Sequence, residues 1–471
     1  MNRVAVINVV GLSERVVGES TPCLSSKIHR WGHRKITPIL PALTCSTQST
    51  YLTGAYPSSH GIIGNGWYFR ELSQVHFWRQ SNALVQGEKI WEAAKRLNSE
   101  FTCANLFWWF NQYSSVNFSV TPRPIYRADG LKIPDIDAEP AFLREQLQKD
   151  LGPFPLYQFW GPGANIRSSQ WISAAAQWIE EEFEPTLSLI YLPHLDYCLQ
   201  REGPLGKGVS EELKKIDRVV ADLVGFFYSQ NVQVIILSEY GVSDVHTPVP
   251  LNRVLREKGF LKVRTECGED HFDAGRSAAF AVCDHQIAHI YVKDPSQLSL
   301  VRADLERLPG VEGVLDRAGQ ASYGLNHERS GDLVAVASPG FWFSYEFWLD
   351  SKRAPDYART VDIHRKPGYD PAELFIDRQR VWPQLRVAMN LAKKQLGFRY
   401  LMDVVPPHGH DVRGSHGRSA VDPVDFPLFI SDQVQGYPEG PIDPLQIKTL
   451  ILNQIFASKE REVAYANDAS Q

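Results

Sequence analysis

Short apolar runs that alternate with amphipathic helical patterns constrain the fold of this chain more than any other feature. The runs cover residues 4–10, 186–192 and 232–237, and a helical pattern that begins at Ser169 or at Ser210 precedes each of the last two. An uninterrupted apolar strand is typical of a parallel sheet that is buried on both faces. The sequence therefore predicts an α/β fold, with a mostly parallel sheet covered by helices on both faces.

The remaining patterns divide the chain of 471 residues into a large core and a small insertion. We expect an α+β insertion at 275–331, where short strands flank a helix at 295–308, and a core formed by 1–274 and 332–457. The polar tail, 458–471, is expected to be flexible. Further core elements are predicted as strands at 35–40, 101–107, 332–337 and 341–348, helices at 21–31, 88–97 and 383–396, and a long loop region at 114–167.

Composition excludes several classes of partner. The net charge of −5 gives no basic footprint, so we expect no nucleic acid polymer as a partner. No segment reaches about 18 uninterrupted apolar residues, so we also expect no membrane partner. The six cysteines are scattered without CxxC spacing, which favours free thiols and a cytoplasmic location. The sequence leaves the oligomeric state open.

The segment 41–66, PALTCSTQSTYLTGAYPSSHGIIGNG, is rich in hydroxyl and small side chains. Thr44 lies just before a predicted short helix at 46–52. Free N–H groups and the positive end of a helix dipole make such a position suitable for holding a phosphate. An ordinary threonine cap followed by a turn is the alternative interpretation.

Polar residues follow the predicted strands. Asn8, Asp196 and Glu239 lie at strand ends, where open α/β sheets bind ligands, and His416 lies in a segment rich in His and Gly. Phosphoryl transfer to a hydroxyl needs that hydroxyl to be activated and the oxygens of the phosphoryl group to be neutralised, which divalent metal ions achieve together. Taken singly, each residue also fits a helix cap, a solvated carboxylate or a loop hydrogen bond.

The order of these motifs resembles the alkaline phosphatase superfamily and, within it, the nucleotide pyrophosphatase/phosphodiesterase (type I phosphodiesterase) branch. The resemblance implies an alkaline-phosphatase-like core, with Thr44 as nucleophile, Asn65 as a phosphate contact and His60 as a brace for the loop. The matching residues are Thr44, Thr53-Gly54, Tyr56-Pro57, His60-Gly61-Ile62 and Asn65, followed by Asp196 in LIYLPHLDYCLQ, by SEYG, and by GSHG with His416.

The implied metal ligands depart from the family pattern. Asp196, His416 and Thr44 are as expected, whereas the family has Asp, His, Asp and His where this chain has Asn8, Gln200, Glu239 and Tyr240. The change moves the ligand set from nitrogen towards oxygen, and so from Zn²⁺ towards Mg²⁺, Mn²⁺ or Ca²⁺, or it weakens metal binding altogether. We expect one or two divalent metal ions (Zn, Mg or Mn).

Three outcomes stay open for this site. It holds one metal at Asp196 and His416, or it recruits ligands among Asp362, His364, His408, His410 and Asp411, or it is a pseudoenzyme that binds a phosphorylated ligand. The expected activity is hydrolysis of a phosphoester or phosphoanhydride in a small phosphorylated substrate, with phosphonate or phosphomonoester hydrolysis as alternatives. Trp108, Trp109 and Tyr113 are candidates either for stacking a flat group or for core packing.

Overall fold

A mostly parallel sheet forms the centre of the molecule, as predicted. The computed structural model describes residues 1–378, 382–433 and 439–457, so the predicted flexible tail lies outside the described residues. Over these ranges the main sheet has eight strands, and β1, β10, β11, β5 and β6 pair in parallel. In sheet order the strands are β2 (His33–Lys35), β21 (Leu428–Ser431), β11 (Gln233–Leu237), β1 (Val4–Val9), β10 (Leu187–Leu192), β5 (Cys103–Leu106), β6 (Phe118–Pro122) and β9 (Ile136–Glu139).

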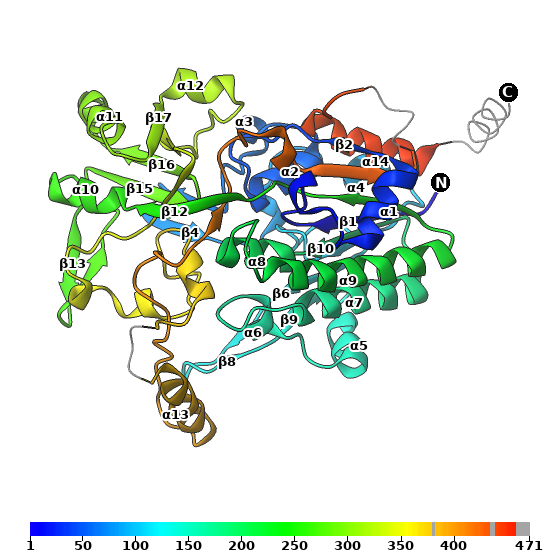
Figure 1. Cartoon of the computed structure of the whole chain (residues 1–471), viewed down its shortest axis with the longest axis horizontal. Coiled ribbons are helices and arrows are strands. Elements are labelled where there is room, and N and C mark those ends of the chain that lie inside the picture. Colours follow the sequence, from blue (N-terminus) through cyan, green and yellow to red (C-terminus); the bar gives the residue numbers. More distant parts are fainter. Residues whose placement is uncertain (379–381, 434–438, 458–471) are drawn as a thin grey trace.

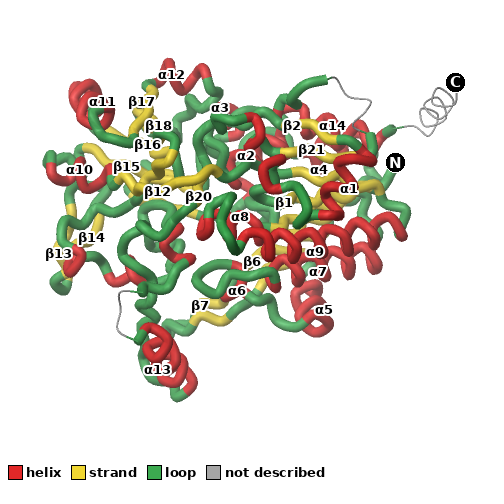
Figure 2. The backbone as a smooth tube through the Cα atoms, in the orientation of Figure 1, coloured by secondary structure: helices red, strands yellow, loops and turns green. Residues whose placement is uncertain are grey.

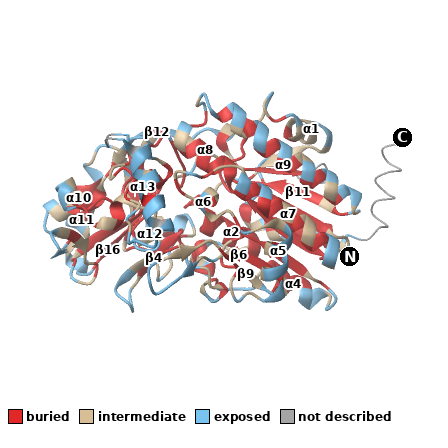
Figure 3. Cartoon of the chain, turned by 90° about the horizontal axis from the view of Figure 1, so that it is seen from below, coloured by how far each residue is buried: buried red, intermediate tan, exposed pale blue. Residues whose placement is uncertain are grey.

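Helices cover both faces of this sheet (Figure 1). On one face α7 packs against β10 and α9 packs against β11, whereas α14 contacts β1 from the other face. Figure 3 shows buried residues concentrated between these layers. The helices of the first face are α1 (Pro22–Trp31), α5 (Phe142–Leu151), α7 (Arg167–Phe183) and α9 (Val209–Ser229), and those of the second are α2 (Thr44–Thr53), α4 (Ile90–Leu97) and α14 (Ile447–Phe456).

The two long helices follow from the spacing of their apolar residues. In α7, Trp171, Ile172, Ala175 and Ile179 recur at helical spacing, and all four are buried. The same holds in α9 for Leu213, Ile216, Val220, Leu223 and Phe227. An apolar stripe of this kind has to pack against another element, here the main sheet.

A second, antiparallel sheet lies beside the first and has its own apolar core (Figures 1 and 2). Its strands, in sheet order, are β15 (Ala279–Asp284), β16 (Ile287–Val292), β18 (Leu333–Ala337) and β17 (Val311–Leu315). Helices α10 (Leu251–Glu257) and α11 (Leu298–Glu306) contact it. A three-stranded sheet of β19 (Gly340–Phe343), β12 (Ser243–Val249) and β20 (Gly414–Ser415) lies nearby.

Four assignments made from the sequence were wrong. The region 114–167 is not a long loop, because it supplies β6, β9 and α5. The segment 332–337 forms β18 of the second sheet, which extends past the predicted insertion boundary at 331, and the segment 341–348 contributes β19 to the three-stranded sheet. The strand predicted at 35–40 lies earlier, at β2. In these segments the pairing between strands determines where each strand forms and which sheet it joins. The local sequence pattern carries little information about the partner of a strand. The overall division into core and insertion stays a prediction.

We predict that Ile190→Ala lowers the free energy of unfolding by about 2–5 kcal/mol, because it opens a cavity in a core that cannot collapse freely. Ile190 is fully buried on β10, between Ile7 on β1 and Leu106 on β5. Chemical denaturation measures the change. Leu72→Ala is the control, since Leu72 is 58% exposed and its replacement should change stability by less than about 0.5 kcal/mol. Equal effects of the two variants would contradict this account of the core.

Candidate active site

The polar residues predicted at strand ends do lie at one edge of the main sheet. Asn8 is on β1, Asp196 is in α8 (His194–Glu202), which follows β10, and Glu239 follows β11. Strands β10 and β11 both pair with β1 in parallel, so their carboxyl ends meet at this edge. Thr44 is the first residue of α2, so the helix begins earlier than the sequence predicted.

Glu239 lies at the centre of a hydrogen-bonded group with Asn8 and Gln48. Asn8 Nδ2 and Gln48 Nε2 each donate to Glu239 Oε1, at 2.6 Å. All three side chains are buried. Burial raises the pKa of Glu239 to about 8, although the two amides and Thr44 oppose the rise by hydrogen bonding. Two neutral amides therefore donate to Glu239 and only partly offset the effect of its burial.

The Thr44 hydroxyl shares a hydrogen bond of 2.9 Å with the Tyr240 hydroxyl. The ring of Tyr240 stacks on the imidazole of His416, with centroids 3.6 Å apart. Burial raises the pKa of Tyr240 well above its ordinary value, so its hydroxyl stays protonated. Tyr240 therefore acts as a hydrogen-bonding neighbour of Thr44.

Asp196 forms a second group with Gln200, Tyr369 and His416. Gln200 Nε2 donates to Asp196 Oδ2 at 2.8 Å, and the Tyr369 hydroxyl donates to Gln200 Oε1 at 2.7 Å. Burial raises the pKa of Asp196 to about 7. His416 Nδ1 donates to the carbonyl of Ala42 at 2.8 Å, which leaves the lone pair of Nε2 facing Asp196 Oδ1 at 3.7 Å. Burial holds the pKa of His416 well below its usual value, so the ring is neutral.

The sequence interpretation missed Asp284 and His285, at the end of β15. Asp284 accepts hydrogen bonds from Asn65 N and Asn65 Nδ2, at 2.8 and 3.1 Å. His285 Nδ1 donates to Asp284 at 2.8 Å, and its ring stacks on Tyr369 at 3.6 Å. The available signal for these residues is an Asp-His pair at the end of an apolar strand. The sequence places that strand in the predicted insertion at 275–331, away from the site.

Two residues of the segment 41–66, Asn65 and His60, act mainly as braces in this structure. Asn65 Oδ1 accepts a hydrogen bond of 3.0 Å from the backbone N–H of Cys45. The side chain predicted to contact phosphate is therefore bonded to the first backbone N–H after Thr44. His60 bonds Thr50 Oγ1 at 3.0 Å and accepts from Ile62 N at 3.1 Å, as a brace would. A phosphate contact by Asn65 would require its bond to Cys45 to be exchanged.

The unpaired polar atoms of the site fit divalent metal ions. Within the described residues, five buried atoms here have no hydrogen-bond partner, and each carries a lone pair: Asn8 Oδ1, Asp196 Oδ1, Glu239 Oε2, His285 Nε2 and His416 Nε2. Cations satisfy such atoms, and the pairs Asp196/His416 and Asn8/Glu239 are the candidate positions. Gln200 and Tyr240 are engaged in other bonds and offer little as ligands.

The predicted replacement ligands do not gather at the site. Within the described ranges, no group of three or more His, Cys, Asp or Glu side chains is arranged to hold a metal ion. His364 lines the cavity described below, but Asp362 lies 3.8 Å from Arg365, and His408 bonds Glu346 and Ser351. His410 and Asp411 are exposed. The two pairs above therefore remain the best-fitting positions.

A cavity of about 660 Å³ adjoins these groups. Thr44, Asp196, Tyr240 and His285 line it on the side of the main sheet, and aromatic and apolar side chains form much of the rest. Trp109 lines it together with Trp78, and their ring centroids lie 4.8 Å apart. In contrast, Trp108 is fully buried and Tyr113 is 78% exposed. Of the three aromatic residues singled out in the sequence, Trp109 is placed to contact a ligand.

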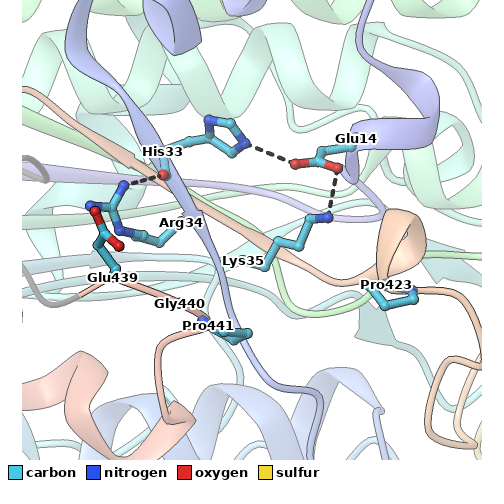
Figure 4. A pocket seen from close by; sticks show the side chains of 8 residues that line it. All are labelled: Glu14, His33, Arg34, Lys35, Pro423, Glu439, Gly440 and Pro441. Carbon is cyan, nitrogen blue, oxygen red and sulfur yellow. Dashed lines mark hydrogen bonds and ion pairs between the residues drawn. The ribbon is translucent and has the colours of Figure 1, made fainter.

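Another hollow, at the edge strand β2, holds none of the site residues (Figure 4). Glu14 there accepts from His33 at 2.9 Å and pairs with Lys35 at 2.8 Å. These charges neutralise each other, so the hollow gives no indication of a ligand.

A buried lysine organises one wall of the cavity. Lys366 Nζ lies 2.7 Å from both Asp370 and Glu373 and donates to the carbonyl of Thr360 at 2.9 Å. Glu373 also accepts from Trp160, which lines the cavity. Because this cluster fixes the segment 360–373, it places Tyr369 against His285.

We predict that Lys366→Met lowers the free energy of unfolding by about 3–5 kcal/mol, because it leaves two buried carboxylates without their cation. Chemical denaturation monitored by tryptophan fluorescence measures the loss. Lys215→Met is the control, since Lys215 forms an exposed pair with Glu212 that should contribute less than about 1 kcal/mol. A loss no greater than that of the control would show that the cluster does not stabilise the wall.

The comparisons with known proteins agree with this architecture. The family described as type I phosphodiesterase / nucleotide pyrophosphatase matches residues 4–370. An uncharacterised pyrophosphatase/phosphodiesterase of Schizosaccharomyces pombe is 25% identical over 296 residues, which cover 60% of this chain and 53% of that protein. Ectonucleotide pyrophosphatase/phosphodiesterase family member 1 of Mus musculus is 22% identical over 242 residues, 49% of this chain and 22% of that protein. The chain thus spans about half or less of the length of these relatives.

Two solved structures share the fold over nearly the whole chain. Phosphonoacetate hydrolase from Sinorhizobium meliloti 1021, in complex with phosphonoacetate, matches with a TM-score of 0.62 at 15% identity, covering 96% of each chain. Murine ectonucleotide pyrophosphatase/phosphodiesterase 5, in complex with AMP, matches with a TM-score of 0.58 at 12% identity, covering 97% of this chain and 95% of that one. The predicted alkaline-phosphatase-like core is confirmed, and the chain belongs to the type I phosphodiesterase / nucleotide pyrophosphatase family of the alkaline phosphatase superfamily.

Proposed function

We propose that this chain hydrolyses a phosphoester or phosphoanhydride bond in a small phosphorylated substrate, with Thr44 as the nucleophile. The observation that carries the proposal is the position of the Thr44 hydroxyl, at the N-terminus of α2 and on the wall of the cavity. Backbone N–H groups at a helix N-terminus favour the negative charge of a phosphoryl group there. Membership of a family of phosphoester hydrolases supports the same activity.

The reaction begins with the attack of Thr44 Oγ1 on phosphorus. The new O–P bond forms as the bond to the leaving oxygen breaks, and the ionised form of Glu239, beside Thr44, accepts the hydroxyl proton. Tyr240 holds the hydroxyl in position through the 2.9 Å bond. Water then cleaves the phosphorylated threonine and restores the hydroxyl.

One or two divalent metal ions (Zn, Mg or Mn), held by Asp196 and His416 and by Asn8, Glu239 and Thr44, would neutralise phosphoryl charge and lower the pKa of the hydroxyl. This part of the proposal is supported by the unpaired lone pairs of four of these residues. With few protein ligands at each position, binding should be weak, and substrate oxygens and water would complete the coordination.

The substrate is a small molecule with a flat or apolar portion. AMP and phosphonoacetate are the ligands of the two structural relatives, and Trp78 and Trp109 offer aromatic surface beside the phosphate position. Phosphonate and phosphomonoester hydrolysis remain the alternatives on the same core. We also retain a cytoplasmic location as a proposal, supported by six cysteines that are all free.

We predict that Thr44→Ala lowers the rate of hydrolysis of an aryl phosphodiester by about 1,000-fold or more, because it removes the nucleophile. A colorimetric assay of nitrophenolate release measures the rate, and Thr44→Ser should retain part of the activity. Thr47→Ala is the matched control, since Thr47 is buried one turn later on α2 and its hydroxyl has no partner among the described residues. Activity of Thr44→Ala equal to that of this control would remove Thr44 from the mechanism.

A ligand-binding protein without catalysis is the second candidate function. Hydrogen bonds from Asn8 to Glu239 and from Gln200 to Asp196 favour it, because amide donors satisfy carboxylates that the family uses to bind metal. Such a site would still present the helix N-terminus and the cavity to a phosphorylated ligand.

Chelation separates the two candidates. We predict that EDTA abolishes hydrolysis, that Mg²⁺ or Mn²⁺ restores it, and that Gln200→His strengthens Zn²⁺ binding by adding an imidazole beside Asp196 and His416. Calorimetric titration of each metal into chelated protein gives the affinities. Wild-type protein that binds AMP in the calorimeter, binds no divalent metal and has no hydrolase activity would instead establish the ligand-binding protein.

A further inference from the structure

Helix α13 (Pro383–Gln395) stands out from the body of the molecule (Figure 1), and it carries exposed apolar side chains. Leu385, Met389 and Leu396 are 55%, 53% and 73% exposed, and Trp382, just before the helix, is 74% exposed. At 100° per residue, Leu385, Met389 and Leu396, which directly follows the last helical residue, fall within one narrow sector of the helix surface. Helices of water-soluble domains normally turn such a stripe inwards, so its exposure indicates a docking surface.

The same segment is basic. Residues 382–402 contain Arg386, Lys393, Lys394 and Arg399 and no Asp or Glu, in a chain whose net charge is −5. The side chains of Lys393 and Arg399 are exposed, and Arg386 pairs with Asp403 at the base of the helix. Lys393 adjoins the apolar sector on the helix surface, so positive charge borders the stripe.

The opposite side of α13 is already used. Val387 and Leu391 line the cavity, and the buried Asn390 donates to the carbonyl of Leu401 at 2.8 Å. These contacts fix which side of the helix faces the body and which faces outwards. The exposed stripe is therefore a consequence of how the helix is seated.

We propose that the outer face of α13 docks on the surface of a lipid bilayer that contains anionic lipids. A helix that lies in the membrane interface has an apolar face, basic residues beside it, and tryptophan or phenylalanine at its margins. Trp382 and Phe398, the latter 65% exposed, lie in the sequence just before and just after the helix. Basic side chains complement an anionic surface, whereas a protein partner would need an acidic groove of matching shape.

This docking differs from membrane insertion. None of the helices in the described ranges is long and apolar enough to cross a membrane, and an interfacial helix does not need to be. The sequence-based expectation of no membrane partner rested on the absence of a long apolar run, which leaves surface binding open. Because α13 forms part of the cavity wall, docking would bring the cavity close to the bilayer.

The proposal predicts flotation of the purified chain with vesicles of phosphatidylcholine and phosphatidylserine, and much weaker flotation with phosphatidylcholine alone. The triple variant Leu385→Ser, Met389→Ser, Leu396→Ser should lower the partition coefficient by about 100-fold or more, because three apolar side chains no longer enter the interface. Lys393→Ala and Arg399→Ala should each lower it by about fivefold, and added salt should do the same.

A matched control triple, Leu72→Ser, Leu97→Ser, Leu205→Ser, changes leucines that are 58%, 60% and 73% exposed elsewhere and should float like the wild type. Far-UV circular dichroism checks that α13 and the fold persist in both triples. Flotation of the α13 triple at the wild-type level overturns the proposal, as does a wild type that ignores anionic vesicles. A wild type that ignores vesicles but self-associates through Leu385, Met389 and Leu396 in sedimentation assigns the face to a protein contact instead. Flotation requires no turnover, so its failure is independent of whether Thr44 is the nucleophile.

Discussion

Parallel pairing of β1 with β10 and β11 is the constraint on which the rest of the site depends. It brings residues at the ends of three separate strands together at one edge, although Asn8 and Glu239 are 231 positions apart. The N-terminus of α2 is held close to the same edge by Thr44, which bonds Tyr240, and by Gln48, which bonds Glu239. The geometry of the sheet therefore determines which sequence positions meet at the site. The side chains at those positions determine its chemistry.

Two buried carboxylates make that chemistry distinctive. Asp196 and Glu239 have pKa values raised by burial, and in each case a neutral amide takes part of the role that a cation would have. A buried carboxylate that is only partly satisfied is costly, so its retention indicates a use beyond stability. The remaining lone pairs point to a ligand or ion of positive charge, or to a phosphorylated substrate that arrives with its own counterion.

Much of this arrangement could be predicted from the sequence. The strands that carry the site are strongly apolar and local in pattern, and the segment that contains Thr44, His60 and Asn65 is contiguous, so their positions followed directly. Asp284, His285 and Tyr369 could not be found in this way, because they reach the site only through the packing of the second sheet and of the segment that Lys366 fixes. The strands β6 and β9 could not be predicted, because their short sequences mix polar and apolar residues without a clear pattern. They become strands by pairing, β6 with β5 and β9 with β6.

The bonds between Asp284 and Asn65 bear on the order in which the molecule assembles. Asp284 ends a strand of the second sheet, while Asn65 belongs to the segment that carries Thr44. The main sheet has its own apolar core, but the segment 41–66 gains the bonds to Asp284 only after the chain has been made as far as β15. During synthesis, the first 274 residues can therefore hold Thr44 through Tyr240 and Gln48, but they lack the bonds from Asn65 to Asp284. The full set of bonds around the segment 41–66 is then complete only after a contact that spans 219 residues has formed.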